Sequence, residues 1–237
     1  MRVTVVRHHE EDAAGFIAEA FAARGATLTV HRFPVDGPLP APGDADHVVL
    51  LGAAWSVYDP SPERAWIADE LAWLRDLDAA GVPVLGICFG AQALAAAFGG
   101  TVEHAGRSEV GWTRVESTDP AVVPAGPWLL FHHDRCLPPP QARVLARNDV
   151  GVQAFTLGRH LGVQFHPEVD AAQLSRWLDD DGRAEAMRAG QDPERFLAQT
   201  RAAEPAARLR AAALVDAALR LAAQIRAVRG SPLRVTG

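Results

Sequence analysis

The chain has 237 residues, with 23 basic and 29 acidic side chains and a formal net charge of −6 at pH 7. Hydrophobic residues make up 49% and charged residues 22% of the sequence, as in a globular protein and unlike a disordered or collagen-like one. The acidic balance argues against a nucleic-acid partner. Every basic residue is arginine, which excludes lysine-dependent sites such as the P-loop or a pyridoxal-phosphate Schiff base.

The sequence offers no sign of a membrane or export segment. No apolar run is long enough to span a bilayer. The first six residues read as a strand and lack the features of a signal peptide. Two cysteines, Cys88 and Cys136, are too few for a disulfide framework or a cysteine-based zinc site. We therefore expect a cytoplasmic protein with no membrane partner.

Strand and helix patterns alternate over the first hundred residues. The apolar spacing predicts strands at 2–6, 26–33, 47–51 and 82–85, and helices at 11–24, 62–80 and 93–98. Strands separated by helices indicate a parallel sheet with right-handed crossovers. We expect an α/β fold with a flavodoxin-like, open and mostly parallel sheet and helices on both faces.

The second half of the chain reads differently. Short strands separated by turn residues are predicted at 111–117, 128–131, 143–147, 152–155 and 161–165, and they indicate a small antiparallel extension of the sheet. From residue 171 onward the pattern is helical. These patterns predict a single domain over 1–237, with a core over about 1–180 and a helical C-terminal extension over about 181–229.

A candidate nucleophile lies between the strand at 82–85 and the helix that follows it. The sequence there is Gly86-Ile87-Cys88-Phe89-Gly90, a Gly-x-Cys-x-Gly pattern. A nucleophile on a tight strand-to-helix turn needs neighbours without side chains, and a helix N-terminus favours a thiolate. The alternative is that Cys88 is a small buried apolar residue, as most intracellular cysteines are.

A second group decides between these interpretations. The segment Gln164-Phe165-His166-Pro167-Glu168 follows another predicted strand, so its side chains emerge at the same carboxyl edge of the sheet. His166 can deprotonate Cys88, and Glu168 can orient the imidazole and stabilise its charged form. A cysteine elbow combined with this motif predicts an acyl-transfer site.

These two motifs resemble those of the class I glutamine amidotransferase family, in particular its stand-alone, GMP-synthetase-like branch. Three further segments carry the resemblance: 51–59, which is similar to the oxyanion loop, 109–112 and 131–138. The resemblance implies that Cys88 is the nucleophile, His166 the base and Glu168 its orienting acid. It further implies an oxyanion hole formed by the backbone N–H groups of Ala53 and Phe89. The substrate-binding residues it implies are Gly52, Gln92, Phe131, His133 and Asp134.

Two positions depart from the family pattern. The loop Gly-Gly-Pro is Gly52-Ala53-Ala54 here, and a loop glycine is replaced by His133. If the oxyanion loop requires a positive φ, Ala53 is strained, and Ala53→Gly is then expected to raise kcat for glutamine.

Other residues have a structural interpretation. His132, His133 and Asp134, with His8 and His9, suggest a metal site, but adjacent strand residues point to opposite faces, so we expect neither a metal nor a cofactor. Cys136 is expected to be inert in a proline-flanked loop. Trp66, Trp73 and Trp177 are expected to pack in the core, whereas Trp55, in the loop at 51–59, is expected to line the substrate pocket.

Three functions remain open on the sequence. The first is hydrolysis of the glutamine side-chain amide through a γ-glutamyl thioester, with the ammonia passed to a separate synthase. The second is a stand-alone γ-glutamyl hydrolase or peptidase for another γ-glutamyl compound. The third is a non-catalytic binding or regulatory module. The presence of Cys88, His166 and Glu168 together argues against the third, because such a module needs none of them.

Overall fold

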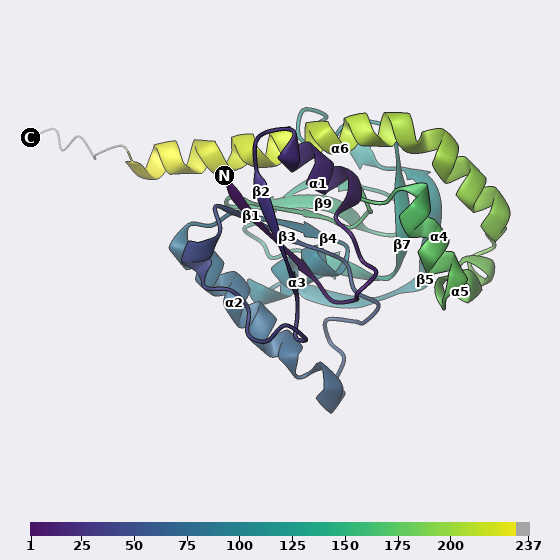
Figure 1. Ribbon diagram of the computed structural model, residues 1–237, viewed down its shortest axis with the longest axis horizontal. Coiled ribbons are helices and arrows are strands. Elements are labelled where there is room, and N and C mark those ends of the chain that lie inside the picture. Colours follow the sequence, from purple (N-terminus) through teal and green to yellow (C-terminus); the bar gives the residue numbers. More distant parts are fainter. Residues whose placement is uncertain (231–237) are drawn as a thin grey trace, which may run out of the picture.

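The fold is organised around one large mixed sheet, seen in a computed structural model that describes residues 1–230, with side chains described to residue 224. The sheet has eight strands in the order β2-β1-β3-β4-β10-β9-β8-β6 (Figure 1). Its strands are β1 Arg2–Arg7, β2 Thr27–Arg32, β3 His47–Leu50, β4 Val84–Ile87, β6 Glu116–Ser117, β8 Arg143–Arg147, β9 Val152–Leu157 and β10 His160–Val163.

The strands on one side of the sheet are parallel and those on the other are antiparallel. β2, β1, β3, β4 and β10 run in one direction, whereas β9, β8 and β6 are added antiparallel. The order β2-β1-β3-β4 is that of the flavodoxin-like fold, in which ligands bind beyond the carboxyl ends of the strands. The predicted fold class is thereby confirmed.

Helices cover both faces of this sheet (Figure 1). α1 (Gly15–Ala22) and α6 (Pro193–Gly230) pack on one face, where Phe16, Ile17 and Leu214 join strand residues in one buried cluster. α2 (Trp66–Ala80) and α3 (Phe89–Ala97) pack on the opposite face around Leu74 and Leu94. Both faces of the parallel strands are therefore buried, which explains their continuous apolar sequences.

A second, two-stranded sheet is formed by β5 (Thr101–Arg114) and β7 (Pro127–Leu137). Helices α4 (Ala171–Asp179) and α5 (Gly182–Arg188) lie beside it (Figure 1), over a third buried cluster that includes Leu129 and Leu174. This sheet and its helices form one wall of the cavity described below.

This region corrects two predictions from sequence. The strand predicted at 111–117 combines the end of β5 with β6 of the main sheet, and the strand predicted at 128–131 is part of β7; the long strands β5 and β7 form a separate sheet. β5 is largely exposed, and a register shift between His104 and Glu109 interrupts its pairing with β7, so the sequence shows no regular alternation. Cys136, predicted to lie in a loop, is a buried residue of β7.

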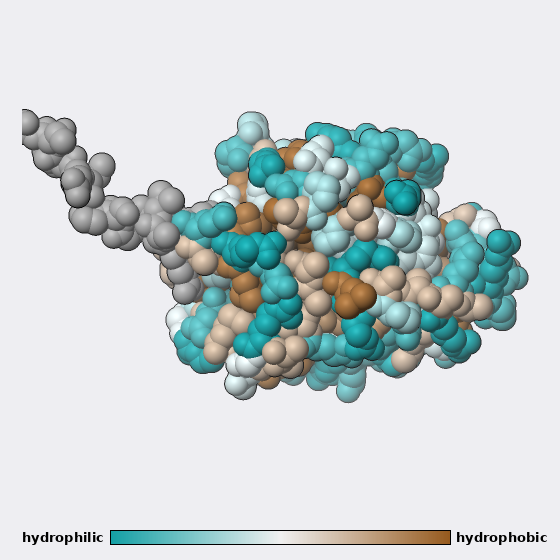
Figure 2. Space-filling model, turned by 90° about the horizontal axis from the view of Figure 1, so that it is seen from above, coloured by the Kyte–Doolittle hydropathy of each residue, from teal (hydrophilic) through white to brown (hydrophobic). Residues whose placement is uncertain are grey.

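The outer surface over α6 is mainly hydrophilic. Figure 2, seen from the side on which α6 lies, shows hydrophilic side chains with smaller hydrophobic areas between them. Arg201, Arg208 and Arg220 of this helix are exposed. Within residues 1–230, no helix combines the length and the apolar character needed to cross a membrane.

Candidate active site

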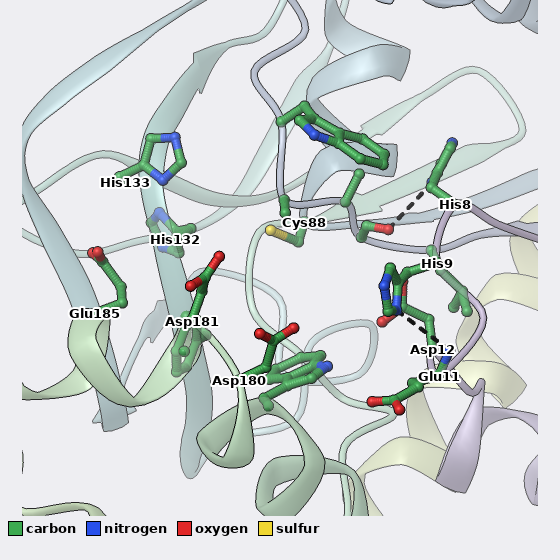
Figure 3. Close-up of a pocket in the computed structure, with 18 of the residues that line it drawn as sticks. His8, His9, Glu11, Asp12, Cys88, His132, His133, Asp180, Asp181 and Glu185 are labelled. Atoms are coloured by element: carbon green, nitrogen blue, oxygen red, sulfur yellow. Dashed lines mark hydrogen bonds between the residues drawn. The ribbon is translucent and has the colours of Figure 1, made fainter.

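Three neighbouring parallel strands bring the predicted site residues to one edge of the sheet. β3, β4 and β10 are adjacent, and their carboxyl ends lead into Gly52, Cys88 and the segment Gln164–Glu168, respectively. In Figure 3 the Cys88 sulfur lies at the centre of a cavity, surrounded by residues from several loops. The sequence-distant motifs therefore meet at one place.

Cys88 occupies a strained turn between β4 and α3. Its φ of 52° and ψ of −107° make it the only non-glycine residue with a positive φ among the residues described. Such a conformation costs of order 1–3 kcal/mol and persists only where the surroundings enforce it. The backbone here holds the sulfur at the N-terminus of α3, as expected for a nucleophile elbow.

The two glycines of the elbow are required by close backbone contacts. A Cβ on Gly86 would lie 2.5 Å from the carbonyl oxygen of Gly90, and a Cβ on Gly90 would lie 2.2 Å from the carbonyl oxygen of Leu50. Both contacts are with backbone, which cannot turn away as a side chain can. The Gly-x-Cys-x-Gly pattern is therefore a packing requirement of this turn.

Gly90→Ala is expected to destabilise the protein by at least about 2 kcal/mol, because the added methyl group forces α3 away from β3. Denaturant unfolding of the purified variant measures this change. Gly43→Ala is a matched control, because a Cβ at Gly43 meets nothing within 4 Å. Equal stabilities of the two variants would contradict the packing argument.

His166 and Glu168 form a buried pair beside Cys88. The Nδ1 atom of His166 lies 2.7 Å from Oε1 of Glu168, and both side chains are almost completely buried. Burial lowers the pKa of His166, but the Glu168 carboxylate and the Cys88 sulfur raise it by more, so that it lies well above its ordinary value. Nε2 of His166 has no hydrogen-bond partner among the described residues. That atom is left available to exchange a proton.

Two glutamine side chains support the sulfur. The amide nitrogen of Gln164 lies 3.6 Å from the Sγ atom of Cys88 and its oxygen accepts a hydrogen bond of 3.2 Å from Gln92. Gly52 also packs close to this pair, because a Cβ on it would lie 3.2 Å from Cε1 of His166 and 3.6 Å from Cβ of Cys88. Gln92 lines the cavity but also positions Gln164.

The cavity above Cys88 has a volume of about 380 Å³. Phe131, His133 and Asp134, predicted on the substrate side, line it together with Gly52 and Gln92. The carboxylate of Asp134 accepts hydrogen bonds from Ser56 (2.5 Å) and Tyr58 (2.9 Å). Asp134 is thus committed to holding the loop after β3, whereas His133 has a side chain that is 43% exposed.

The family model for class-I glutamine amidotransferases matches residues 12–181. The chain belongs to the class I glutamine amidotransferase family. It is 40% identical over 131 residues to a GMP synthase [glutamine-hydrolyzing] of Parafrankia sp., covering 52% of this chain and 23% of that protein. A GMP synthase of the same description from Aeropyrum pernix is 38% identical over 157 residues, covering 60% of this chain and 29% of that protein. The chain thus matches about a quarter of the length of these relatives.

Solved structures match over nearly the whole chain. A glutamine amidotransferase from Thermotoga maritima superposes with a TM-score of 0.82 at 26% identity, covering 94% of this chain and 98% of that one. A glutamine amidotransferase from Methylobacillus flagellatus has a TM-score of 0.83 at 24% identity, covering 93% and 94%, and shows the same fold.

Ala53, a departure from the pattern of this family, is not strained in the structure. Its φ is not positive, since Cys88 is the only non-glycine residue described with that feature. Within the described residues the Ala53 N–H donates no hydrogen bond to the protein. Phe89 is the first residue of α3, where the N–H has no partner within the helix. Both N–H groups implied for the oxyanion hole are thus unoccupied.

The expectation for Ala53→Gly therefore changes. We now expect the kcat of this variant for glutamine to be unchanged or up to several-fold lower. Glycine relieves no strain here, and it makes the ordered loop entropically more costly, by about 0.5–1 kcal/mol. Steady-state kinetics of the variant tests this. A several-fold higher kcat would show that the loop must adopt another conformation during turnover.

Several cavity residues were missed from the sequence. Trp177 packs against the third buried cluster, as predicted, but it also lines the cavity, with its ring centroid 5.0 Å from that of His166, edge to face. Asp180, Asp181 and Glu185 lie on the same wall (Figure 3). A tryptophan on an amphipathic helix carries no signal that distinguishes core from cavity, and these acidic residues look like any solvated helix end.

His132, one of the histidines that line the cavity, is held by protein groups. Nδ1 of His132 lies 2.9 Å from the backbone oxygen of Asp134, and its Nε2 lies 3.3 Å from Oε2 of Glu109. Over the described range, no three metal-ligating side chains are grouped so as to hold an ion.

Proposed function

We propose that this protein hydrolyses the side-chain amide of glutamine to glutamate and ammonia through a γ-glutamyl thioester on Cys88. The observation that carries this proposal is the strained Cys88 at the foot of a cavity, directly beside a histidine whose other ring nitrogen is bound to a buried carboxylate. Membership of the class I glutamine amidotransferase family supports the same reaction.

In the first half-reaction, the sulfur of Cys88 attacks the γ-glutamyl carbonyl carbon. An imidazolium at His166 favours the thiolate form of the neighbouring cysteine, and the raised pKa of His166 supports such a pair. The N–H groups of Ala53 and Phe89 stabilise the developing oxyanion. The C–N bond then breaks as Nε2 of His166 gives its proton to the leaving ammonia.

In the second half-reaction, Nε2 of His166 accepts a proton from water, which attacks the thioester carbonyl carbon. The C–S bond breaks, glutamate leaves and the sulfur of Cys88 is regenerated as a thiolate beside the imidazolium. Glu168 keeps the ring oriented in both steps through its 2.7 Å contact with Nδ1. The proposed cycle uses only protein groups and water, so it needs no cofactor.

A separate synthase is the proposed acceptor of the ammonia. The curated relatives are described as glutamine-hydrolysing GMP synthases, and the similarity to this chain extends over about a quarter of their length. We infer that an acceptor for this protein would be a different polypeptide or a different part of a longer one.

A second candidate function is hydrolysis of another γ-glutamyl compound. The cavity, at about 380 Å³, is within the range of about 300–1,000 Å³ of sites for drug-sized ligands. Its lining carries seven carboxylates against two arginines, Arg176 and Arg188, of which Arg188 pairs with Glu185. The carboxylates belong to Glu11, Asp12, Asp134, Glu168, Asp180, Asp181 and Glu185. These features favour a larger leaving group that bears positive charge.

The test is to incubate the purified protein with glutamine and with a panel of γ-glutamyl amides and peptides, and to measure ammonia, amine and glutamate. Release from glutamine supports the first proposal, and release only from the other donors supports the second. Release from none of them, with a folded protein, would contradict both and favour a binding module.

A further inference from the structure

A second buried histidine–carboxylate pair lies next to the candidate site. His8 follows β1 and Glu70 lies in α2, and the side chains of both are completely buried. Nε2 of His8 is 3.0 Å from Oε1 and 3.3 Å from Oε2 of Glu70. Burial of an ionisable pair is costly unless its geometry is good and its hydrogen bonds are satisfied. The reaction proposed above uses neither residue.

The other ring nitrogen of His8 is directed at the oxyanion loop. Nδ1 of His8 lies 3.2 Å from the carbonyl oxygen of Gly52 (Figure 3). A carbonyl oxygen and a carboxylate only accept, so Nδ1 donates to Gly52 and Nε2 donates to Glu70, with the ring in its charged form. The two hydrogen bonds fix the orientation of the ring. Burial lowers the pKa of His8, but Glu70, the Gly52 carbonyl and Asp12 together raise it by more.

The carbonyl of Gly52 and the N–H of Ala53 belong to one peptide group. That peptide is trans, since the one cis peptide bond in the described residues is Phe33–Pro34. In a trans peptide the C=O and N–H bonds point in opposite directions. Holding the Gly52 oxygen on His8 therefore directs the Ala53 N–H away from His8, and Gly52 itself packs against Cys88 and His166.

The same ring contacts the other half of the oxyanion hole. The centroid of His8 lies 5.0 Å from the ring of Phe89, in an edge-to-face arrangement, and 5.1 Å from the stacked ring of Trp66. Phe89 supplies the second N–H group implied for the hole. One buried side chain thus contacts the carbonyl of Gly52 and the ring of Phe89.

We propose that His8, oriented by Glu70, is a positioning residue that holds the Gly52–Ala53 peptide with its N–H aimed at the oxyanion. This inference rests on the proposed acyl transfer at Cys88. Its consequence is that the oxyanion hole is preformed in this chain and that no partner protein is needed to turn the loop.

Four variants separate positioning from packing. His8→Leu removes the donor to Gly52, whereas His8→Asn keeps an N–H near the position of Nδ1. Glu70→Leu removes the partner of Nε2, whereas Glu70→Gln keeps a hydrogen bond to it. We expect kcat to fall roughly 10- to 100-fold in the two leucine variants. This decrease is smaller than the decrease of about 10²–10³-fold that follows complete loss of an oxyanion donor. KM should change little, and the Asn and Gln variants should recover most of the loss.

Comparing two reactions of Cys88 separates a positioning role of His8 from a packing role. Alkylation by iodoacetamide is a substitution at a saturated carbon and forms no oxyanion, whereas acylation by glutamine does. In the leucine variants we expect the alkylation rate to stay within about 2-fold of wild type while turnover falls. The matched control is His160→Leu, which disrupts another buried histidine paired with a carboxylate, Asp78, where β10 begins, at the end of that strand remote from Cys88.

The wild-type protein is assayed first, with glutamine, the γ-glutamyl panel and p-nitrophenyl acetate. If no γ-glutamyl compound is turned over, the proposed function fails, and the four variants are compared in Cys88-dependent acylation by p-nitrophenyl acetate, which builds an oxyanion at the same sulfur. The inference is overturned if no Cys88-dependent acylation occurs, or if His8→Leu retains wild-type acyl transfer. It is also overturned if alkylation falls in parallel with acyl transfer, or if His160→Leu lowers kcat as much.

Discussion

Cys88→Ser should abolish turnover while leaving the protein folded. A serine hydroxyl is a far weaker nucleophile than a thiolate beside an imidazolium, so we expect kcat to fall by about 10⁴- to 10⁶-fold, as for loss of the nucleophile in other acyl-transfer enzymes. The substitution changes the volume little and leaves the elbow glycines in place. Steady-state release of glutamate and a thermal unfolding curve measure the two quantities.

Cys136→Ala is the matched control for this experiment. Cys136 is the other cysteine of the chain and lies buried in β7. We expect this variant to keep wild-type turnover at some cost in stability, because it leaves a small cavity. Residual wild-type activity in Cys88→Ser, or loss of activity in Cys136→Ala without unfolding, would contradict the assignment of the nucleophile.

Glu168→Gln should lower kcat by roughly 10²- to 10⁴-fold with little change in KM. Glutamine keeps the shape of the side chain but loses the charge that stabilises the imidazolium and fixes its tautomer. Glu168 is one of the groups that raise the pKa of His166, so the variant should also shift the NMR titration of this histidine to lower pH. Glu194→Gln, on the exposed surface of α6, is the control.

The sign of the pH dependence follows from the same pair. Because the folded-state pKa of His166 is raised, its pairing stabilises the protein at low pH, and this contribution is lost as the pH rises through the folded-state pKa. Glu168→Gln should reduce the contribution. A variant whose His166 titrates as in wild type, with unchanged kcat, would remove Glu168 from the site.

The parts of the site that follow local rules were accessible from sequence. The elbow could be located because two glycines flank a cysteine between an apolar strand and a helix, and the structure shows that a Cβ at either glycine would clash with backbone. His166 and Glu168 could be placed beside it because carboxyl ends of parallel strands share one edge. Their arrangement in space agrees with that expectation, and their catalytic roles stay a prediction.

The parts that depend on distant packing were not accessible. His8 and Glu70 are 62 residues apart, and nothing in either segment indicates that α2 places a carboxylate beside the end of β1. Trp177 lies on an amphipathic helix, where the spacing of apolar residues is the same for a core and a cavity wall. The length of β5 was missed because its exposed and irregularly paired residues give no alternation.

The measurement that tests the central claim most directly is labelling with an electrophilic glutamine analogue at pH 8, followed by peptide mapping. Burial raises the pKa of Cys136 to about 12, so only roughly one molecule in ten thousand carries that thiolate at this pH. We predict one label per chain, on Cys88, with free glutamine slowing the reaction and Glu168→Gln labelled more slowly. Equal labelling of Cys88 and Cys136, or labelling of Cys88 that glutamine does not slow, would contradict a glutamine-binding site built around Cys88.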